Sequence, residues 1–177
     1  MEAALAQQAR EDPTLFTPLY KRYRDPIYWY LRARVSRDED AADLTQQVFL
    51  QAIERLHQYQ LRKGSFAAWL FAIARHAASN SHRRPRSVDW DFLPPALQAT
   101  ETDTTEMDVL QRERVARITQ LVGSLPVAKR ELLVLRFVSG LTIPDIAALI
   151  GKSPEATRKE LRRTLDTLKE HYDDPTI

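Results

Sequence analysis

The chain has no cysteine among its 177 residues, and glycine occurs only four times. Without thiols there is neither a disulfide framework nor a zinc site with thiolate ligands. No apolar run approaches the roughly 18–20 residues that cross a bilayer, and the opening MEAALAQQAR lacks the apolar segment of a signal peptide. We therefore expect a cytoplasmic protein with no membrane insertion. Its 44% hydrophobic residues are enough to form a core.

The formal net charge of +2 conceals segments of opposite sign. Residues 10–85 carry 13 Lys and Arg against 8 Asp and Glu, and residues 109–172 carry 12 against 7. Between them, residues 86–108 carry one Arg against six acidic residues. Two basic blocks are a common feature of nucleic-acid binding, because cations neutralise phosphates. Solvated helix faces would explain the charge equally well.

The hydrophobic pattern predicts an all-α protein, because glycine is scarce and the period-2 alternation of strands is absent. It divides into two small helical domains, residues 10–85 and 108–172, joined by a flexible acidic linker over 86–107. The pairs Asp12-Pro13 and Asp25-Pro26 each place a capping carboxylate before a proline, which predicts helix starts at 13 and 26. The other predicted helices span 39–57, 65–84, 108–123, 126–139, 142–150 and 154–172.

The predicted linker contains Trp90, Phe92 and Leu93, which are unusual in such a polar segment. They either dock onto a flanking domain or are available to a partner, and the sequence favours neither interpretation.

The stretch TIPDIAALIGKSPEATRKELRRTLDTLKE, residues 142–170, fits a helix-turn-helix. Ala147 is small enough for the second helix to cross closely, and Gly151 can adopt a positive φ at the turn. Ser153 and Pro154 can cap and begin the second helix. At 100° per residue, one side of that helix comprises Pro154, Thr157, Leu161, Leu165, Leu168 and Tyr172.

The opposite side of this second helix is basic, with Lys159, Arg162 and Arg163 pointing outward and Arg158 beside them. A basic outer face suits a helix that reads the DNA major groove, because Arg binds guanine edges and both cations bind phosphates. The alternative is an ordinary helical hairpin with a solvated face. Glu160 on this helix could accept a hydrogen bond from cytosine or simply be solvated.

Helix 39–57 has a buried stripe and an opposite polar face that contains Asp43, Gln46, Gln47, Leu50 and Glu54. Leu50 in this polar surface is a candidate contact for a protein partner, although a lone exposed leucine is often without consequence. On helix 65–84, Arg75, Ser79 and His82 lie opposite the core. This polar and basic face suits contact with single-stranded nucleic acid, or is a solvated helix end.

Three stretches together resemble the bacterial sigma factors of the extracytoplasmic-function (ECF) class, in the sigma-70 family. They are DAADLTQQVFLQA (40–52), GSFAAWLFAIAR (64–75) and LPVAKRELLVLRF (125–137), the last followed by the helix-turn-helix. The resemblance covers residues 12–171. It implies a transcription initiation factor that binds core RNA polymerase and promoter DNA and is paired with an anti-sigma factor. No small-molecule substrate, cofactor or metal is expected.

The resemblance also implies roles for particular residues. Docking on the polymerase falls to Asp40, Asp43, Gln46, Gln47 and Leu50. Opening and reading the −10 element falls to Tyr59, Arg62, Lys63, Ser65, His76, Ser79, Asn80, Arg83 and Arg84. Reading the −35 element falls to Thr157, Arg158, Lys159, Arg162 and Arg163.

Two other classes of function compete with this interpretation. A helix-turn-helix transcription regulator with an N-terminal sensor or dimerisation domain would share the C-terminal block, but has no reason to carry the exposed face of helix 39–57. An enzyme fits poorly, because the four histidines lack metal-ligand spacing and no P-loop is present. We therefore expect no catalytic residue.

Overall fold

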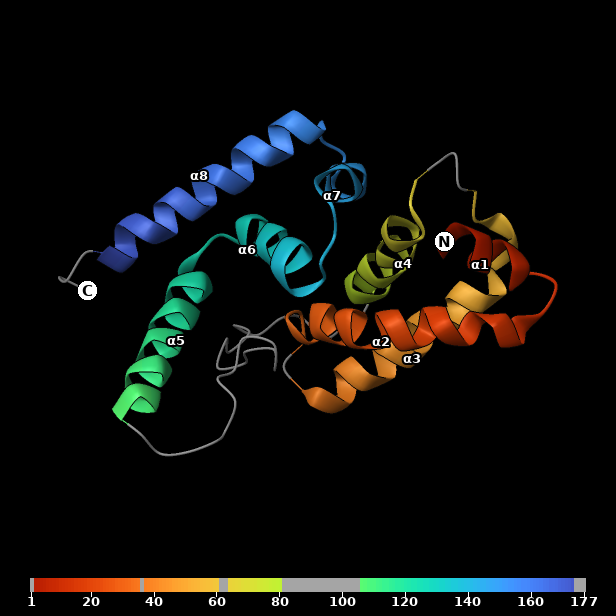
Figure 1. Ribbon diagram of the computed structural model, residues 1–177, viewed down its shortest axis with the longest axis horizontal. Coiled ribbons are helices and arrows are strands. Elements are labelled where there is room, and N and C mark those ends of the chain that lie inside the picture. Colours follow the sequence, from red (N-terminus) through yellow and green to blue (C-terminus); the bar gives the residue numbers. More distant parts are fainter. Residues whose placement is uncertain (1, 36, 61–63, 81–105, 174–177) are drawn as a thin grey trace.

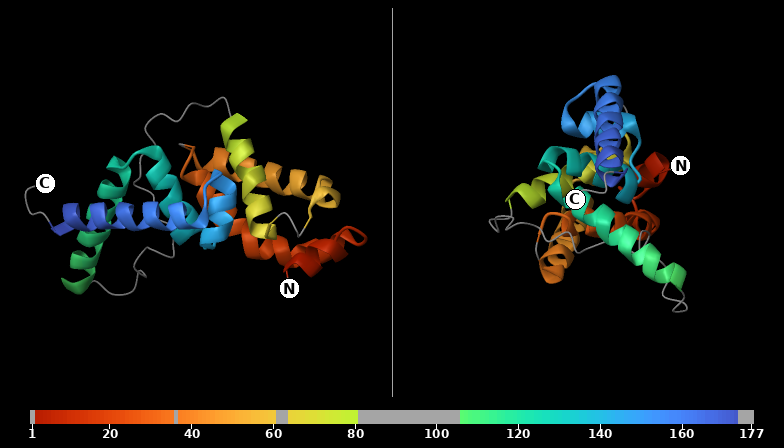
Figure 2. Two further views of the ribbon diagram at one scale, coloured as in Figure 1. Left: turned by 90° about the horizontal axis from the view of Figure 1, so that it is seen from above. Right: turned by 90° about the vertical axis from the view of Figure 1, so that its left-hand side faces the viewer.

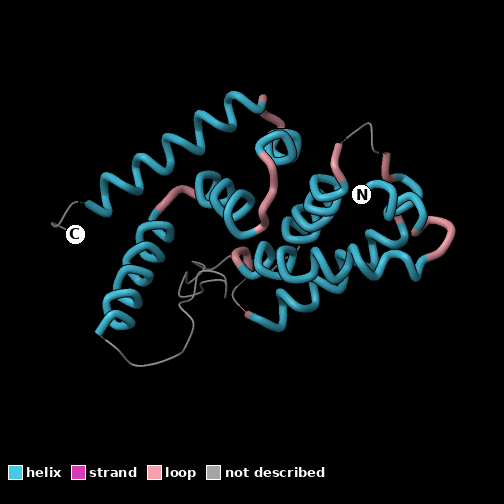
Figure 3. Tube along the Cα trace, in the orientation of Figure 1, coloured by secondary structure: helices cyan, strands magenta, loops and turns pink. Residues whose placement is uncertain are grey.

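The computed structural model describes residues 2–35, 37–60, 64–80 and 106–173, and these residues are helical with short connections (Figures 1 and 3). Residues 81–105, which include most of the predicted linker with Trp90, Phe92 and Leu93, lie outside the described residues. Within the described parts no strand occurs, as the all-α prediction requires.

The N-terminal half is built on α2 (Thr17–Arg32), α3 (Asp38–Glu54) and α4 (Phe66–Asn80), which pack on one another. Short 3-10 segments, Pro13–Phe16 and Leu56–Gln58, precede α2 and follow α3. The Asp12 carboxylate accepts hydrogen bonds from the Thr14 amide and hydroxyl, and these bonds lower its pKa. The predicted helix start at residue 13 is thus confirmed, in the form of a 3-10 turn.

The predicted break at Asp25-Pro26 is wrong, because α2 continues through Pro26. A proline inside a helix removes one backbone hydrogen bond and costs roughly 3 kcal/mol. Burial of the apolar face of α2 offsets this cost. The buried side chains of α2 are Leu19, Tyr23, Ile27, Tyr30 and Leu31.

A short helix, α1 (Glu2–Gln8), precedes the residues assigned to the N-terminal domain from the sequence. Ala6 and Ala9 are buried in the core, and the Tyr23 hydroxyl donates to Glu2 over 2.7 Å. Arg22 forms an ion pair with the same carboxylate. The N-terminal unit therefore begins before residue 10.

The C-terminal half comprises α5 (Glu106–Ser124), α6 (Val127–Leu133), α7 (Ile143–Ile150) and α8 (Pro154–Asp173). A π-helical segment, Val134–Val138, extends α6. α8 packs against α5, α6 and α7, and Figure 1 shows α8 spanning the outer side of this half.

The two halves contact each other, through α4 against α7 and through α2 against the π-helical segment. Figure 2 shows the same proximity from two further directions. One cluster of buried apolar side chains runs from Phe16, Tyr30 and Phe71 to Leu135 and Ile146. The two predicted domains therefore share a continuous core.

Local capping positions the helix-turn-helix as the sequence predicts. The Thr142 hydroxyl accepts from the Asp145 amide at the start of α7, and the Ser153 hydroxyl accepts from the Ala156 amide at the start of α8. Gly151 lies between them with φ of 70°, and Ala147 is buried on α7, which packs against α8. These features fix the angle at which α8 leaves the turn.

Replacing Gly151 tests this turn. A Cβ at this position would meet no atom within 4 Å, so the cost of Gly151→Ala is the left-handed backbone alone. We expect a loss of about 1 kcal/mol in the free energy of unfolding, measured by urea denaturation. Gly151→Asn is the matched control, since asparagine tolerates this conformation, and it should lose less. Equal losses for both variants would contradict this account of the turn.

Candidate functional site

The outer face of α8 displays four of the five residues predicted to read the −35 element. Arg158, Lys159, Arg162 and Arg163 are all exposed. The opposite face is held in the core by Thr157, Leu161 and Thr164, which are buried. The helix therefore presents a row of cations to solvent over its first turns.

Thr157 does not belong to this exposed row. Its side chain is 0% exposed, and its hydroxyl donates to the Ser153 carbonyl over 2.9 Å. Assigning it a DNA contact is therefore wrong. Helical periodicity alone placed Thr157 on the inner side, and the family resemblance was misleading at this position.

Glu160 interrupts the positive row but is itself neutralised. Its carboxylate forms an ion pair with Lys152 at the turn before α8. Lys152 is not among the predicted DNA contacts. Because Lys152 and Glu160 are eight residues apart, helical spacing does not predict their ion pair. The positive charge of the first three turns of α8 is carried by the four exposed cations.

The outer face of α3 is arranged as the sequence predicts. Asp43, Gln46 and Gln47 are exposed, and Leu50 is 62% exposed. Ile53, which the sequence analysis missed, is 44% exposed and one turn further along the same helix. An apolar pair surrounded by polar groups is suited to a protein contact.

Asp40 is an exception on α3, because it is only 8% exposed. It lies in the first turn of the helix, where a carboxylate interacts favourably with the helix dipole. Asp40 therefore offers little side-chain surface, although it lines the cleft between α3 and α4, and its contact with polymerase stays a prediction.

A cleft of about 300 Å³ lies between α3 and α4. Asp43 and Gln47 line it from α3, and His76 and Asn80 line it from α4. The His76 ring and the Asn80 amide are 2.8 Å apart. Residues predicted to bind polymerase and residues predicted to bind DNA therefore line the same cleft. Their separation in the sequence did not indicate this proximity.

Tyr59 was expected in an exposed, DNA-opening loop, and this expectation is wrong. It is 5% exposed, and its ring packs against Phe66 and Trp69. Burial raises the pKa of its hydroxyl. Arg10 donates to the Tyr59 carbonyl over 2.5 Å and fixes the backbone here. Arg62 and Lys63 lie outside the described residues.

The remaining predicted −10 residues occupy both ends of α4. Ser65 caps its start by accepting from the Ala68 amide, and it also donates to Asp145 of the C-terminal half. His76, Ser79 and Asn80 are exposed near its end. Arg83 and Arg84 lie outside the described residues.

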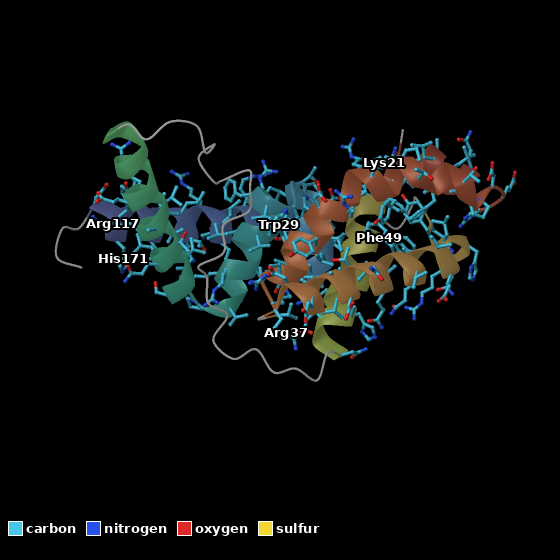
Figure 4. All side chains as sticks on the ribbon, turned by 90° about the horizontal axis from the view of Figure 1, so that it is seen from below. Lys21, Trp29, Arg37, Phe49, Arg117 and His171 are labelled. Atoms are coloured by element: carbon cyan, nitrogen blue, oxygen red, sulfur yellow. The ribbon has the colours of Figure 1, made fainter. Side chains whose placement is uncertain are left out.

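Figure 4 shows the described side chains from below, with Phe49 of α3, whose ring packs against Tyr20 of α2. Among these residues, no group of three or more His, Asp or Glu side chains is placed to hold a metal ion. Of the helices searched in the described ranges, none is long and apolar enough to cross a bilayer.

A capped helix-turn-helix with a cationic outer helix, joined to a second helical unit with its own exposed face, defines a two-domain helix-turn-helix protein. Two family models match the chain, Sigma-70 region 2 over residues 19–88 and Sigma-70 region 4 over residues 116–168. The chain belongs to the sigma-70 family and is an RNA polymerase sigma factor of the ECF type. This assignment sets aside the transcription regulator with a sensor domain.

Several curated relatives carry the same description. The chain is 31% identical to the ECF RNA polymerase sigma factor SigD of Mycobacterium tuberculosis, over 96% of this chain and 82% of SigD. It is 31% identical to the ECF RNA polymerase sigma factor BldN of Streptomyces coelicolor, over 95% of this chain and 64% of BldN. The fold is similar to that of CnrH, solved in complex with the cytosolic domain of CnrY. The TM-score is 0.70 at 23% identity, with 99% of both chains covered.

Two substitutions on α3 test whether its outer face is free of any role in folding. Leu50→Ala should change the free energy of unfolding by less than about 0.5 kcal/mol, because its side chain already contacts water. Val48→Ala, at a fully buried position of the same helix, should lose about 2 kcal/mol. Urea denaturation measures the free energy of unfolding of both variants. A large loss in Leu50→Ala would show that Leu50 supports the fold and is not free for a partner.

Proposed function

We propose that the sigma factor divides its work among three exposed helix faces. The outer face of α3 binds core RNA polymerase through Asp43, Gln46, Gln47 and Leu50. The exposed end of α4, with His76, Ser79 and Asn80, contacts the −10 element and its melted strand. The outer face of α8 reads the −35 element through Arg158, Lys159, Arg162 and Arg163.

The arrangement of α8 is the observation that carries this proposal. A helix with one buried face and a row of arginines on the other fits the major groove, whose guanine edges accept bidentate hydrogen bonds from Arg. Its first turns project from a capped turn, so the cations are held in one orientation.

A partner that holds this protein inactive is also part of the proposal. Relatives of this family, such as CnrH, have been solved with a second protein, in that case the cytosolic domain of CnrY. We expect an anti-sigma factor to cover the exposed α3 face, because Leu50 and Ile53 expose apolar area there. The chain itself contributes no catalytic group and acts in the cytoplasm, where polymerase and promoter DNA are found.

Run-off transcription tests the division of roles on α8. Purified protein and core polymerase should produce transcripts from a promoter selected by the wild type. Arg162→Ala should lower promoter affinity of the holoenzyme by about tenfold, since one Arg–base pair contributes about 1–3 kcal/mol. Lys169→Ala, an exposed cation near the other end of the same helix, is the control and should change little.

The buried Thr157 supplies a further control in the same assay. Thr157→Val keeps the shape of the side chain, so promoter affinity should stay within about twofold of the wild type. If Thr157→Val matched the loss of Arg162→Ala while the protein remained folded, the assignment of the DNA-reading face would be overturned.

Polymerase binding is measured separately from DNA binding. Leu50→Ala should weaken association with core polymerase by roughly 5–30-fold, as expected for a central apolar contact of about 1–2 kcal/mol. Glu155→Ala, an exposed residue of α8, is the control and should bind as the wild type does. Operator binding by the isolated chain, without any affinity for polymerase, would contradict the proposed function.

A further inference from the structure

One guanidinium from the start of the chain binds the backbone that follows α3. Arg10 lies just after α1, and its Nε donates to the Leu56 carbonyl over 3.1 Å. Its Nη2 donates to the carbonyls of His57 and Tyr59, over 2.7 Å and 2.5 Å. A single side chain therefore binds three carbonyls of the 3-10 turn after α3, although it lies more than 40 residues away in the sequence.

These carbonyls lie where the helical hydrogen bonding of α3 ends. The 3-10 turn is closed by the Gln58 amide, which donates to the Arg55 carbonyl, and by the Tyr59 amide, which donates to the Leu56 carbonyl. The last carbonyls of a helix lack backbone donors further along the chain, so side chains or water must bind them. Arginine suits this role because its planar fork carries five N–H donors, whereas the donors of lysine share one nitrogen.

Arg10 is itself held by contacts on both sides of it in the chain. The preceding residue, Ala9, is buried, as is Ala6 one turn earlier. On the other side, the Asp12 carboxylate caps the next 3-10 turn. Glu2, at the far end of α1, bonds to two side chains of α2. The position of the guanidinium is therefore restricted by the packing of the residues around it.

The backbone bound by Arg10 leads directly to the start of α4. The Tyr59 ring packs edge-on against Phe66, and its hydroxyl donates to the Gly64 carbonyl over 3.4 Å. The next residue, Ser65, caps the first turn of α4. Tyr59 and Gly64 lie near the two ends of the connection between α3 and α4. By fixing the Tyr59 backbone, Arg10 therefore restricts both ends of this connection.

We propose that Arg10 is a positioning residue for recognition of the −10 element. The inference rests on the proposed function, in which α4 contacts this element, and on the predicted −10 role of Ser65 at the start of α4. Arg10 contacts no DNA in this scheme. It holds the connection before α4 in one orientation, so that the side chains that read the unpaired bases need not be ordered when DNA binds.

A positioning role and a direct phosphate contact predict different losses. A cation that binds phosphate strengthens binding to every sequence alike, because phosphate contacts carry no sequence information. A group that orders the reading surface instead changes the preference for one sequence over another. The ratio of the affinities for a selected and an altered −10 sequence therefore distinguishes the two roles of Arg10.

Binding of the holoenzyme to a forked DNA probe measures this ratio. The probe carries a duplex −35 element and a single-stranded −10 element, either as selected by the wild type or with its bases scrambled. We expect Arg10→Ala to reduce the preference for the selected strand about tenfold, as for the loss of one base contact. Affinity for the duplex −35 element alone should not change. Lys21→Ala removes the same charge from an exposed site of α2 and should keep the wild-type preference.

Arg10→Lys provides a second variant for the same measurement. It keeps the charge but not the planar fork, so it should lose a smaller part of the preference than Arg10→Ala. Circular dichroism establishes which variants are folded. If Arg10→Ala does not fold, Arg10→Lys decides the question, and a preference equal to that of the wild type would overturn the inference.

Amide hydrogen exchange tests the contact without DNA. The amides of Gln58 and Tyr59 close the turn that Arg10 binds. In Arg10→Ala both should exchange at least about fivefold faster than in the wild type, because the turn opens more often. The amide of Phe71, in the buried part of α4, should exchange as in the wild type. Lys21→Ala should leave all three rates unchanged.

The outcomes separate this inference from the proposed function. Faster exchange together with a reduced −10 preference supports the inference. An unchanged preference or unchanged exchange in folded Arg10→Ala, an equal loss of affinity for both strands, or the same loss of preference in Lys21→Ala overturns it. If the wild type itself does not prefer the selected strand, the proposed role of α4 fails, and the inference fails with it. A preference that the wild type shows and Arg10→Ala keeps overturns the inference alone.

Discussion

Burial of one face of each helix in a single core is the constraint from which the rest of this structure follows. The inner side of α8 is held by Thr157, Leu161 and Thr164, and the inner side of α3 by Val48 and Ala52. Since a helix has a fixed period, fixing the inner side also fixes the outer side. The outward direction of the α8 cations and of Leu50 on α3 therefore follows from the packing of the opposite face of each helix.

The same core also brings the two halves together. The sequence predicted only two domains joined by a linker and did not indicate this contact. Contacts of α4 with α7 and of α2 with the π-helical segment accompany the placing of Glu131 next to Arg34 and Arg75. A partly buried carboxylate beside two arginines and a tyrosine hydroxyl has its hydrogen-bonding capacity satisfied.

The sequence predicted most of the architecture because the signals were local. Asp12, Gly151 and Ser153 act near their own positions in the chain, and apolar periodicity located most of the major helices. Prediction failed where tertiary packing overrides a local signal. At Pro26, burial along α2 outweighs the missing hydrogen bond.

The errors at the site have a similar origin. Tyr59 was assigned from family position, but the aromatic cluster around Phe66 buries it. The cleft between α3 and α4 and the Glu131 contacts join residues distant in sequence, so no motif could indicate them. The outward direction of Arg162 and Leu50 was predictable, because it depends on helical period alone.

Site-specific photo-crosslinking within the assembled promoter complex is the most direct measurement of the central claim. A crosslinking side chain at position 50 should attach to a large subunit of the polymerase, and one at position 163 should attach to DNA in the −35 element. Crosslinks from position 50 to DNA would contradict the account. So would a complex in which position 50 does not crosslink to polymerase and position 163 does not crosslink to the −35 element.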